Sequence, residues 1–369
     1  MRIGIDLTGI WRPSTGIFVY AKSLARELLL VDERNEYTLF FSGEIHPEFK
    51  KLTHRFRAAV LPLREEVMTK QLLMPVSCNT SRLDLIHFPS LPPPVACFRP
   101  YIWTLHDATP WLYPDTMDLK GRLYFQWAGS WAARVSKALI TVSYEARRNI
   151  MNALRLAESK VRVVYEGIDD AFEKMRDKAF LGSIRQRYGL PERFLLSVST
   201  LEPRKNIPSL IRAYHRIKRA NDTKLGLVLT GRTGWKSDFL RDVLECDSDR
   251  IVVTGFVPQR DLVALYNLAE AFVLPSLYEG FGFPPLEAMA CGCPVIVSNR
   301  GSLPEVVGDA ALLIDPESED SIVAAIRALE SSPTLRADLA RRGMEQVKQF
   351  SWKTAAAKTL ELYQEVGAN

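Results

Sequence analysis

The sequence lacks long apolar runs, and it has few cysteines. No stretch approaches the roughly 18 consecutive apolar residues of a membrane-spanning helix, and the segment after Met1 enters a short strand without the apolar core of a signal peptide. We therefore expect neither a membrane span nor secretion. An odd number of cysteines in so long a chain indicates free thiols in a reducing cytosol, so we expect a cytoplasmic protein. The five cysteines are Cys78, Cys97, Cys246, Cys291 and Cys293.

Two common cofactor and metal motifs are also missing. The loop from Thr8 to Gly16 holds no Gly-x-Gly-x-x-Gly, so the fingerprint of a dinucleotide-dependent dehydrogenase is absent. Cys291-Gly-Cys293 has no second pair of ligands, which favours core packing over a zinc site. His87 ends an apolar run, and we interpret it as a structural histidine.

The remaining pattern indicates two α/β domains. A chain of 369 residues exceeds the usual size of one hydrophobic core. Short apolar runs alternate with helix-patterned segments, which is typical of doubly wound parallel sheets. We expect one domain at 1–170, a second at 171–350, and a helix at 351–369 that crosses back to the first. The expected strands are residues 3–7, 37–42, 58–61, 84–88, 101–105, 138–142, 161–164, 194–199, 225–230, 251–254, 271–274 and 294–298.

The stretch from Ser276 to Pro294 has the pattern of a binding turn. It lies between two apolar runs that predict buried parallel strands, so it connects a strand to a helix at the carboxyl edge of a sheet, where open α/β folds bind ligands. Gly280 and Gly282 allow a ligand to approach the backbone. The pair Pro284-Pro285 suits the first turn of a helix, where no amide donor is needed.

Two carboxylates flank this expected helix start. Glu279 lies in the loop before it, and we expect Glu287 inside its first turn. A helix N-terminus attracts phosphate, whereas a carboxylate accepts hydrogen bonds from hydroxyls. The combination predicts a ligand that carries both phosphates and sugars.

Other strand ends of the second half offer complementary groups. Arg204 and Lys205 follow the first strand of that half, and two adjacent cations suit a diphosphate, although such pairs are also common on solvated surfaces. The turns at Gly231 and Gly255 could admit a base and a ribose, though each alone is weak evidence.

Together these segments resemble the retaining glycosyltransferases of family 4, which have the GT-B fold of two facing Rossmann-like domains with an interdomain cleft. The resemblance covers nearly the whole chain, and its most specific part is the E-x7-E motif from Glu279 to Glu287. The subgroup with P-R-K-N and H-D resembles bacterial mannosyltransferases and related hexosyltransferases of surface polysaccharide assembly. The supporting motifs are L-E-P-R-K-N (201–206), T-G-F-V (254–257), T-L-H-D (104–107), I-T-V-S (140–143) and S-T-G-I-F-V-Y-A (14–21).

The resemblance implies roles for individual residues. Glu279 lies near the transferred sugar, Glu287 holds the ribose hydroxyls, Arg204 and Lys205 neutralise the leaving diphosphate, and His106 lies near the donor sugar. Asp107 either contacts the acceptor or orients the ring of His106. The wider set of donor-binding candidates is Gly16, Thr200, Gly231, Phe256, Val257, Gly280, Phe281, Gly282 and Phe283. The acceptor-side candidates are Asp107, Trp111 and Tyr113, although aromatic residues at helical spacing also fit a core.

The implied reaction moves a hexose, with mannose as the first choice, from a nucleotide sugar to a saccharide acceptor that is lipid-linked, in polysaccharide or O-antigen synthesis. We expect retention by same-face attack and no metal or other cofactor, with side chains neutralising the charge of the diphosphate. Many relatives have Gly-Arg where this chain has Ser199-Thr200, and Gly-Gly where it has Thr15-Gly16. The detailed roles of those two turns are therefore open.

Charge distribution suggests a membrane contact. Residues 1–180 hold 25 Lys and Arg against 20 Asp and Glu, and the second half is balanced at 48 − 25 = 23 against 43 − 20 = 23. The basic stretch 46–64 either touches an anionic membrane or an anionic acceptor, or is a solvated face. We expect no nucleic-acid partner. The alternatives to a transferase are a nucleotide-sugar epimerase, a phosphorylase, or a non-catalytic nucleotide-sugar-binding subunit of the same fold.

Overall fold

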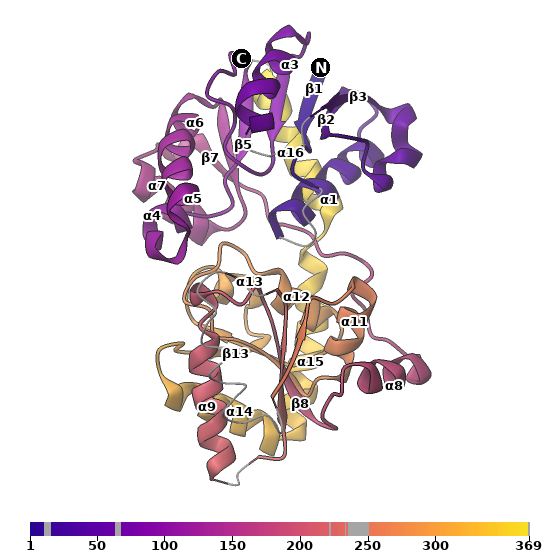
Figure 1. The fold of residues 1–369 in the computed structure, drawn as a ribbon, viewed down its shortest axis with the longest axis vertical. Helices are drawn as coiled ribbons and strands as arrows, with labels where there is room; N and C mark the ends of the chain where they lie inside the picture. Colours follow the sequence, from indigo (N-terminus) through magenta and orange to yellow (C-terminus); the bar gives the residue numbers. More distant parts are fainter. Residues whose placement is uncertain (11–15, 63–67, 221–222, 233, 235–250, 368–369) are drawn as a thin grey trace. The chain divides into compact units, whose positions relative to one another are not determined.

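The computed structural model describes residues 1–10, 16–62, 68–220, 223–232, 234 and 251–367. The chain divides into two compact units. Unit 1 comprises Met1–Gly167 and Phe350–Asn369, and unit 2 comprises Ile168–Gln349. Each unit is built around its own parallel β-sheet, and each is described by itself below (Figure 1).

Unit 1 contains a parallel sheet of seven strands in the order β3-β2-β1-β4-β5-β6-β7. The apolar runs of the sequence become strands, as predicted, and these are largely buried except for the two edge strands. The strands are β1 (Arg2–Asp6), β2 (Glu36–Ser42), β3 (Phe56–Leu61), β4 (Leu85–Phe88), β5 (Tyr101–Thr104), β6 (Ala138–Thr141) and β7 (Val161–Val163). The strand order reverses between β1 and β4, which makes that edge the topological switch point of the unit.

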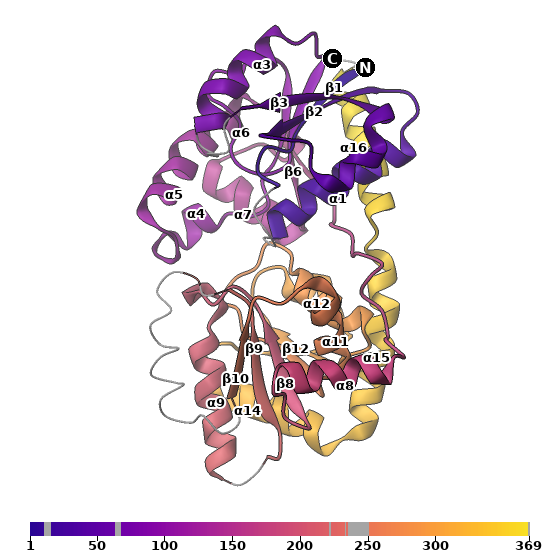
Figure 2. The ribbon, with the colours of Figure 1, turned by 45° about the vertical axis from the view of Figure 1, so that its right-hand side comes forward.

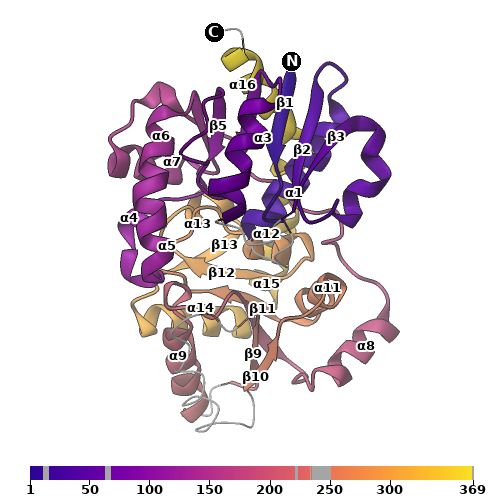
Figure 3. The ribbon, with the colours of Figure 1, turned by 45° about the horizontal axis from the view of Figure 1, so that its top comes forward.

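Helices cover both faces of this sheet. On one face α1 (Gly16–Val31) packs against the C-terminal helix α16 (Trp352–Gly367). On the other face α3, α6 and α7 contribute to the apolar core (Figure 3). The remaining helices of unit 1 are η1 (Pro47–Arg55), the π turn η2 (Thr69–Leu73), α3 (Met74–Thr80), α4 (Thr109–Leu112), η3 (Pro114–Thr116), α5 (Leu119–Tyr124), the π turn η4 (Phe125–Gly129), α6 (Ser130–Val135), α7 (Tyr144–Leu154) and η5 (Glu158–Lys160).

Unit 2 contains a parallel sheet of six strands in the order β10-β9-β8-β11-β12-β13. Five of its strands were predicted. The sixth, β13, is a short, partly exposed strand that the sequence analysis missed, although its residues form an apolar run. The strands are β8 (Phe194–Val198), β9 (Gly226–Thr230), β10 (Ile251–Gly255), β11 (Ala271–Leu274), β12 (Val295–Ser298) and β13 (Ala311–Ile314). Here the switch point lies between β8 and β11.

The sheet of unit 2 is also covered on both faces. Helices α9 and α14 pack together over one face, and α11, α12 and α15 lie on the other (Figure 2). The helices are α8 (Lys178–Arg187), η6 (Pro203–Lys205), α9 (Ile207–Arg219), α11 (Gln259–Leu268), α12 (Phe283–Ala290), α13 (Leu303–Val307), α14 (Glu319–Ser331), α15 (Pro333–Gln346) and η7 (Val347–Gln349). Two α/β units with parallel sheets confirm the predicted fold class.

Candidate active site

The switch point of unit 2 brings two predicted segments together. Strand β8 ends in the turn that carries Arg204 and Lys205, and β11 ends in the loop that carries Glu279. Because β8 and β11 are neighbours in the sheet, their carboxyl ends meet at one edge. The turn and the loop are also joined by their backbones, since Leu277 N donates to Arg204 O at 2.9 Å.

Glu279 is the centre of a buried ion cluster at this edge. Its carboxylate accepts from Arg204 Nη1 at 2.9 Å, from Lys205 Nζ at 2.6 Å and from Ser276 Oγ at 2.6 Å. Burial alone would raise the pKa of Glu279, but the positive charges of Lys205 and Arg204 and these hydrogen bonds lower it to about 2. Burial and the neighbouring Arg204 lower the pKa of Lys205. Glu279 is therefore held as a carboxylate near neutral pH.

Glu202 completes the cluster, and the sequence analysis missed it. Its Oε1 accepts from Arg204 Nη2 at 2.7 Å, and Arg204 Nη1 also donates to Tyr278 O at 2.7 Å. Glu202 is 5% exposed, so its charge is buried beside the guanidinium. Two carboxylates thus face two cations, and the formal charge of the cluster is zero. The only signal in the sequence was the proximity of Glu202 to Arg204.

A turn after β12 holds the loop that carries Glu279. Ser302 Oγ donates to the carbonyl oxygens of Glu279, at 3.0 Å, and Phe281, at 2.8 Å, and Ser302 N donates to Glu279 O at 3.1 Å. Gly301 has a φ of 59°, and a Cβ built on it would lie 2.7 Å from Glu279 O and 2.8 Å from Glu279 N. Glycine is therefore required for this close approach. The sequence analysis did not identify either residue.

The start of α12 is as predicted, but the position of Glu287 is not. Gly282, at a φ of 112°, precedes the helix, and the prolines 284 and 285 lie in its first turn. Because prolines have no N–H, two of the four amides that a helix N-terminus normally leaves unpaired are missing here. The first turn holds no acidic residue. Glu287 lies one turn further along α12, so its expected place beside the free amides is wrong.

Glu287 is held by a neighbouring helix. Tyr266 in α11 donates its hydroxyl to Glu287 Oε2 at 2.7 Å. Burial raises the pKa of Glu287 to about 7, against the lowering effect of this hydrogen bond. The carboxylate therefore changes its protonation near neutral pH. Tyr266 is fully buried, and nothing in the sequence pattern connected it to Glu287.

The turns after β9 and β10 differ in the space they offer. A Cβ on Gly231 would lie 1.8 Å from Ser199 O, so this glycine makes room for the backbone that leads to Thr200. By contrast, a Cβ on Gly255 would meet no atom within 4 Å. Phe256 is 50% exposed and carries the guanidinium of Arg232 at 4.8 Å from its ring centroid, whereas Val257 is buried. Arg232 had not been identified from the sequence.

In unit 1, both ring nitrogens of His106 are engaged. His106 Nε2 lies 3.0 Å from Pro89 O, so it donates to that carbonyl, and Nδ1 lies 3.1 Å from Glu166 Oε1. Burial raises the pKa of Glu166. Tyr20 packs edge-on against the ring at 4.6 Å. Glu166, which the sequence analysis missed, is therefore the residue that orients His106.

The other candidates of unit 1 are less clearly placed at a site. Asp107 Oδ1 accepts from Thr109 N at 2.8 Å, whereas the hydrogen bonds of the His106 ring go to Glu166 and Pro89. Trp111 Nε1 donates to Ser130 Oγ at 3.3 Å, and its ring packs against the apolar core. Tyr113 follows the short helix α4. Gly16 begins α1, but the residues before it from 11 to 15 lie outside the described residues.

Metal-binding patterns are scarce in the part of the chain that the structure describes. There, no three His, Cys, Asp or Glu side chains are grouped as a metal site. Cys78, Cys97, Cys291 and Cys293 are buried free thiols. Cys246 lies outside the described residues, as does the triplet Asp247-Ser248-Asp249, the Asp-x-Asp pattern that some glycosyltransferases use for a metal and that the sequence analysis overlooked.

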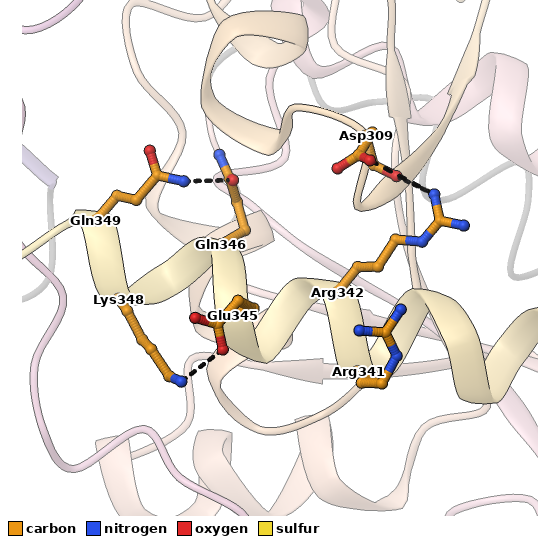
Figure 4. A pocket seen from close by; sticks show the side chains of 7 residues that line it. All are labelled: Asp309, Arg341, Arg342, Glu345, Gln346, Lys348 and Gln349. Carbon is orange, nitrogen blue, oxygen red and sulfur yellow. Dashed lines mark hydrogen bonds and ion pairs between the residues drawn. The ribbon is translucent and has the colours of Figure 1, made fainter.

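A surface pocket of unit 2 lies apart from these residues. The side chains that line it come from α15, η7 and the turn before β13, and they pair with one another: Arg342 with Asp309, Lys348 with Glu345, and Gln349 with Gln346 (Figure 4). None of the predicted site residues lines this pocket. It therefore adds nothing to the candidate site.

Both halves of the chain match models of glycosyltransferase families. A family model described as Glycosyltransferase Family 4 matches residues 14–172, and one described as Glycosyl transferases group 1 matches residues 183–346. O-antigen chain mannosyltransferase B of Escherichia coli is 31% identical over 98% of this chain and 99% of its own length.

Solved structures share the fold. Sucrose-phosphate synthase from Thermosynechococcus elongatus aligns over 100% of this chain and 99% of its own, with a TM-score of 0.79 and 20% identity. Alr3699/HepE of Anabaena, solved in complex with UDP-glucose, aligns over 99% of this chain and 100% of its own, with a TM-score of 0.76 and 20% identity.

Proposed function

The chain belongs to glycosyltransferase family 4 and has the GT-B fold, and from this premise we propose that it transfers mannose from a nucleoside diphosphate donor to a saccharide acceptor in O-antigen synthesis. The observation that carries the choice of sugar is the 31% identity, over nearly the whole chain, with an O-antigen chain mannosyltransferase. The ion cluster around Glu279 supports a donor that carries a diphosphate, because Arg204 and Lys205 lie at the carboxyl edge of the sheet of unit 2.

The proposed reaction proceeds with retention and without a metal. The bond between the sugar C1 and the phosphate oxygen breaks, and its electron pair stays on that oxygen. The acceptor hydroxyl attacks C1 from the same face and gives its proton to the departing phosphate. Arg204 and Lys205 stabilise the charge that forms on the diphosphate. The oxygens of Glu279 already accept three hydrogen bonds. This favours a carboxylate that positions the two cations over one that forms a covalent bond to the sugar.

The remaining roles are proposed from the resemblance of the sequence to the family. Glu287 holds the ribose hydroxyls, His106 contacts the donor sugar, and the turn at Gly255 and Phe256 accommodates the base. The acceptor is lipid-linked, so the enzyme works in peripheral contact with the cytoplasmic face of a membrane. No helix in the described residues has the length and apolar character to cross a bilayer.

Donor hydrolysis tests the proposed activity. The protein is incubated with GDP-, UDP- and dTDP-sugars, and we expect slow release of nucleoside diphosphate from GDP-mannose, unchanged by EDTA. Nuclear magnetic resonance of the transfer product should show the anomeric configuration of the donor. If no nucleotide sugar binds or is hydrolysed, the transferase proposal is wrong, and binding without turnover would favour a non-catalytic subunit.

Two variants test the division of roles. Glu287→Ala should weaken nucleotide binding at least tenfold, whereas Glu279→Ala should chiefly lower turnover. Glu319→Ala, which removes a half-exposed partner of Arg212 away from the site, is the matched control and should change neither. The opposite pattern for the first two variants would overturn the assignment.

A further inference from the structure

An exposed apolar stripe runs along the α5–η4–α6 segment of unit 1. On an ideal α-helix, side chains four residues apart do not lie directly above one another, and their angular position around the axis shifts in one direction with each step. The π turn η4 contains more residues per turn and reduces this drift, so the stripe stays on one side of the segment. Its members are spaced four residues apart and are 66%, 56%, 68%, 51% and 47% exposed: Leu119, Leu123, Trp127, Trp131 and Val135.

Other exposed apolar side chains belong to segments that hydrogen bonds connect to α5, directly or through Gln71. Gln71 of η2 donates its Nε2 to Tyr124 Oη of α5 at 2.8 Å, which joins the two helical segments. The loop that follows β4 is attached to the same place, because Val95 N donates to Gln71 Oε1 at 3.2 Å. The exposed apolar side chains of these neighbours are Leu72, Val76 and Phe98, at 59%, 63% and 83%.

Most of the charges around the stripe are positive, although Asp118, which precedes Leu119 at the start of α5, is exposed. Residues 119–137 contain four basic side chains and no acidic one. Lys120, Arg134 and Lys137 are exposed, and Arg122 pairs with Asp115 at 3.5 Å. Large apolar side chains with tryptophan on one face, bordered by Lys and Arg, are typical of helices that lie in the interface of an anionic bilayer. A second copy of the chain on the same surface would place like charges against each other.

We propose that this surface, formed by Leu119, Leu123, Trp127, Trp131 and Val135, is the part of the protein that inserts into the headgroup region of an anionic membrane. The inference rests on the proposed membrane contact and specifies where it occurs. Insertion buries the apolar stripe, and the flanking cations meet the lipid phosphates.

The basic stretch 46–64 is a weaker choice for this contact. Its one large aromatic residue in the η1 helix, Phe49, is buried. Arg55 donates to the carbonyl oxygens of Leu29 and Asp32, so it stabilises the end of α1. Lys50 and Lys51 are exposed, and the one large exposed apolar side chain in the described part of this stretch is Val60 of β3, against five in the stripe.

Vesicle flotation tests the surface directly. Vesicles of phosphatidylcholine with or without phosphatidylglycerol are mixed with the full chain, and we expect binding that requires the anionic lipid. The double variant Leu123→Ser with Trp127→Ser should lower the partition coefficient at least tenfold. Leu313→Ser, at an exposed leucine of β13 in unit 2, is the matched control and should leave it unchanged. Lys50→Ala with Lys51→Ala should change it less than twofold.

Two further measurements separate insertion from other occupants. Dibrominated lipids should quench tryptophan fluorescence, and Trp127→Phe should reduce that quenching, which a remote structural effect would not do. GDP-mannose hydrolysis without vesicles should be the same in all these variants. An active wild-type protein that does not bind vesicles overturns the inference but leaves the transferase proposal standing. Dissociation of an oligomer by the double variant, without an effect on vesicle binding, would instead show that a protein covers the surface.

Discussion

At the scale of single residues, the candidate site is defined by paired charges. Arg204 and Lys205 have been assigned to a diphosphate, yet Glu202 and Glu279 already balance them. Glu279 is bonded to both cations, whereas Glu202 contacts Arg204 alone among them. A diphosphate that approaches this cluster meets the attraction of two cations and the repulsion of two carboxylates. We therefore predict that Glu202 limits how tightly the diphosphate product can bind.

Removing the charge of Glu202 should tighten binding of nucleoside diphosphates. Glu202→Gln keeps an oxygen that accepts from Arg204 but removes one negative charge from a buried cluster. At an effective dielectric constant near that of a protein surface, we expect about 1 kcal/mol of extra affinity, or roughly fivefold, for GDP and for pyrophosphate. Isothermal titration calorimetry measures this change, and slower product release should lower kcat.

The control for this variant is Glu270→Gln, which removes the charge from another carboxylate that pairs with an arginine, Arg193, at 2.8 Å. That variant should leave the affinity for GDP unchanged. Weaker binding by Glu202→Gln would mean that Glu202 acts by fixing the position of Arg204, and the argument from charge balance would be wrong.

Some single residues could be recognised from sequence and others could not. Glu279, Arg204 and Lys205 follow strands of a parallel sheet, so their meeting at one edge could be expected from topology. Glu166, Tyr266 and Ser302 contact site residues through pairings between distant segments, such as the 60 residues between His106 and Glu166. No local pattern encodes such pairings, so these residues became visible only in the folded structure.

At the scale of elements, the loop that carries Glu279 depends on a neighbouring turn. Ser302 makes three hydrogen bonds to the backbone of this loop, and Gly301 allows the two backbones to approach. The loop itself contains glycines, which do not restrict its backbone conformation. The prolines in the first turn of the following helix fix only where the loop ends. The position of Glu279 is therefore set by β12 and α13 as much as by β11 and α12.

Gly301→Ala should displace the loop and lower activity. The new Cβ would meet backbone atoms of Glu279 at 2.7 and 2.8 Å, and alanine at a positive φ adds about 1 kcal/mol of strain. We expect a loss of at least tenfold in GDP-mannose hydrolysis and a destabilisation of about 2 kcal/mol in urea unfolding.

Gly189→Ala is a closely matched control for this experiment. Gly189 has a φ of 58°, but a Cβ there would meet no atom within 4 Å. The control therefore carries the strain of a positive φ without the collision, and it should lose stability by about 1 kcal/mol and keep full activity. Equal activity in both variants would show that the contact between Gly301 and Glu279 does not position the loop.

Elements were predicted well where the apolar pattern is strong. Buried strands such as β11, Ala271–Leu274, appear with the expected bounds because a continuous apolar run between turns has few other interpretations. Strand β13 was missed although Ala311–Ile314 is an apolar run, because its alanine and leucine residues favour a helix as much as a strand. The π turns η2 and η4 were missed because residue periodicity does not distinguish a wider turn from an ordinary one, although η4 aligns the exposed stripe of unit 1.

At the scale of the whole molecule, the end of the chain belongs to the first unit. Helix α16 packs on α1, and its Tyr363 hydroxyl lies 2.6 Å from His87 Nδ1. The other nitrogen of His87 lies 2.8 Å from Thr104 Oγ1, which in turn lies 3.2 Å from Tyr20 Oη. This buried chain of hydrogen bonds joins α16 to two strands of the sheet and to α1. The structural role predicted for His87 agrees with these contacts.

This network predicts how the stability of unit 1 depends on pH. Burial lowers the pKa of His87 to about 3, whereas an unfolded histidine has a pKa of about 6.5. Between these values the unfolded chain binds a proton that the folded chain does not, so stability falls as the pH decreases through this window, by about 2 kcal/mol at pH 5.

Urea unfolding at pH 7 and pH 5 measures this loss of stability. His87→Gln should lose about 2 kcal/mol less than the wild-type protein between these pH values, and His54→Gln, at an exposed histidine, should lose as much as the wild type. An equal pH dependence in all three proteins would show that α16 is not held to unit 1 through a neutral His87.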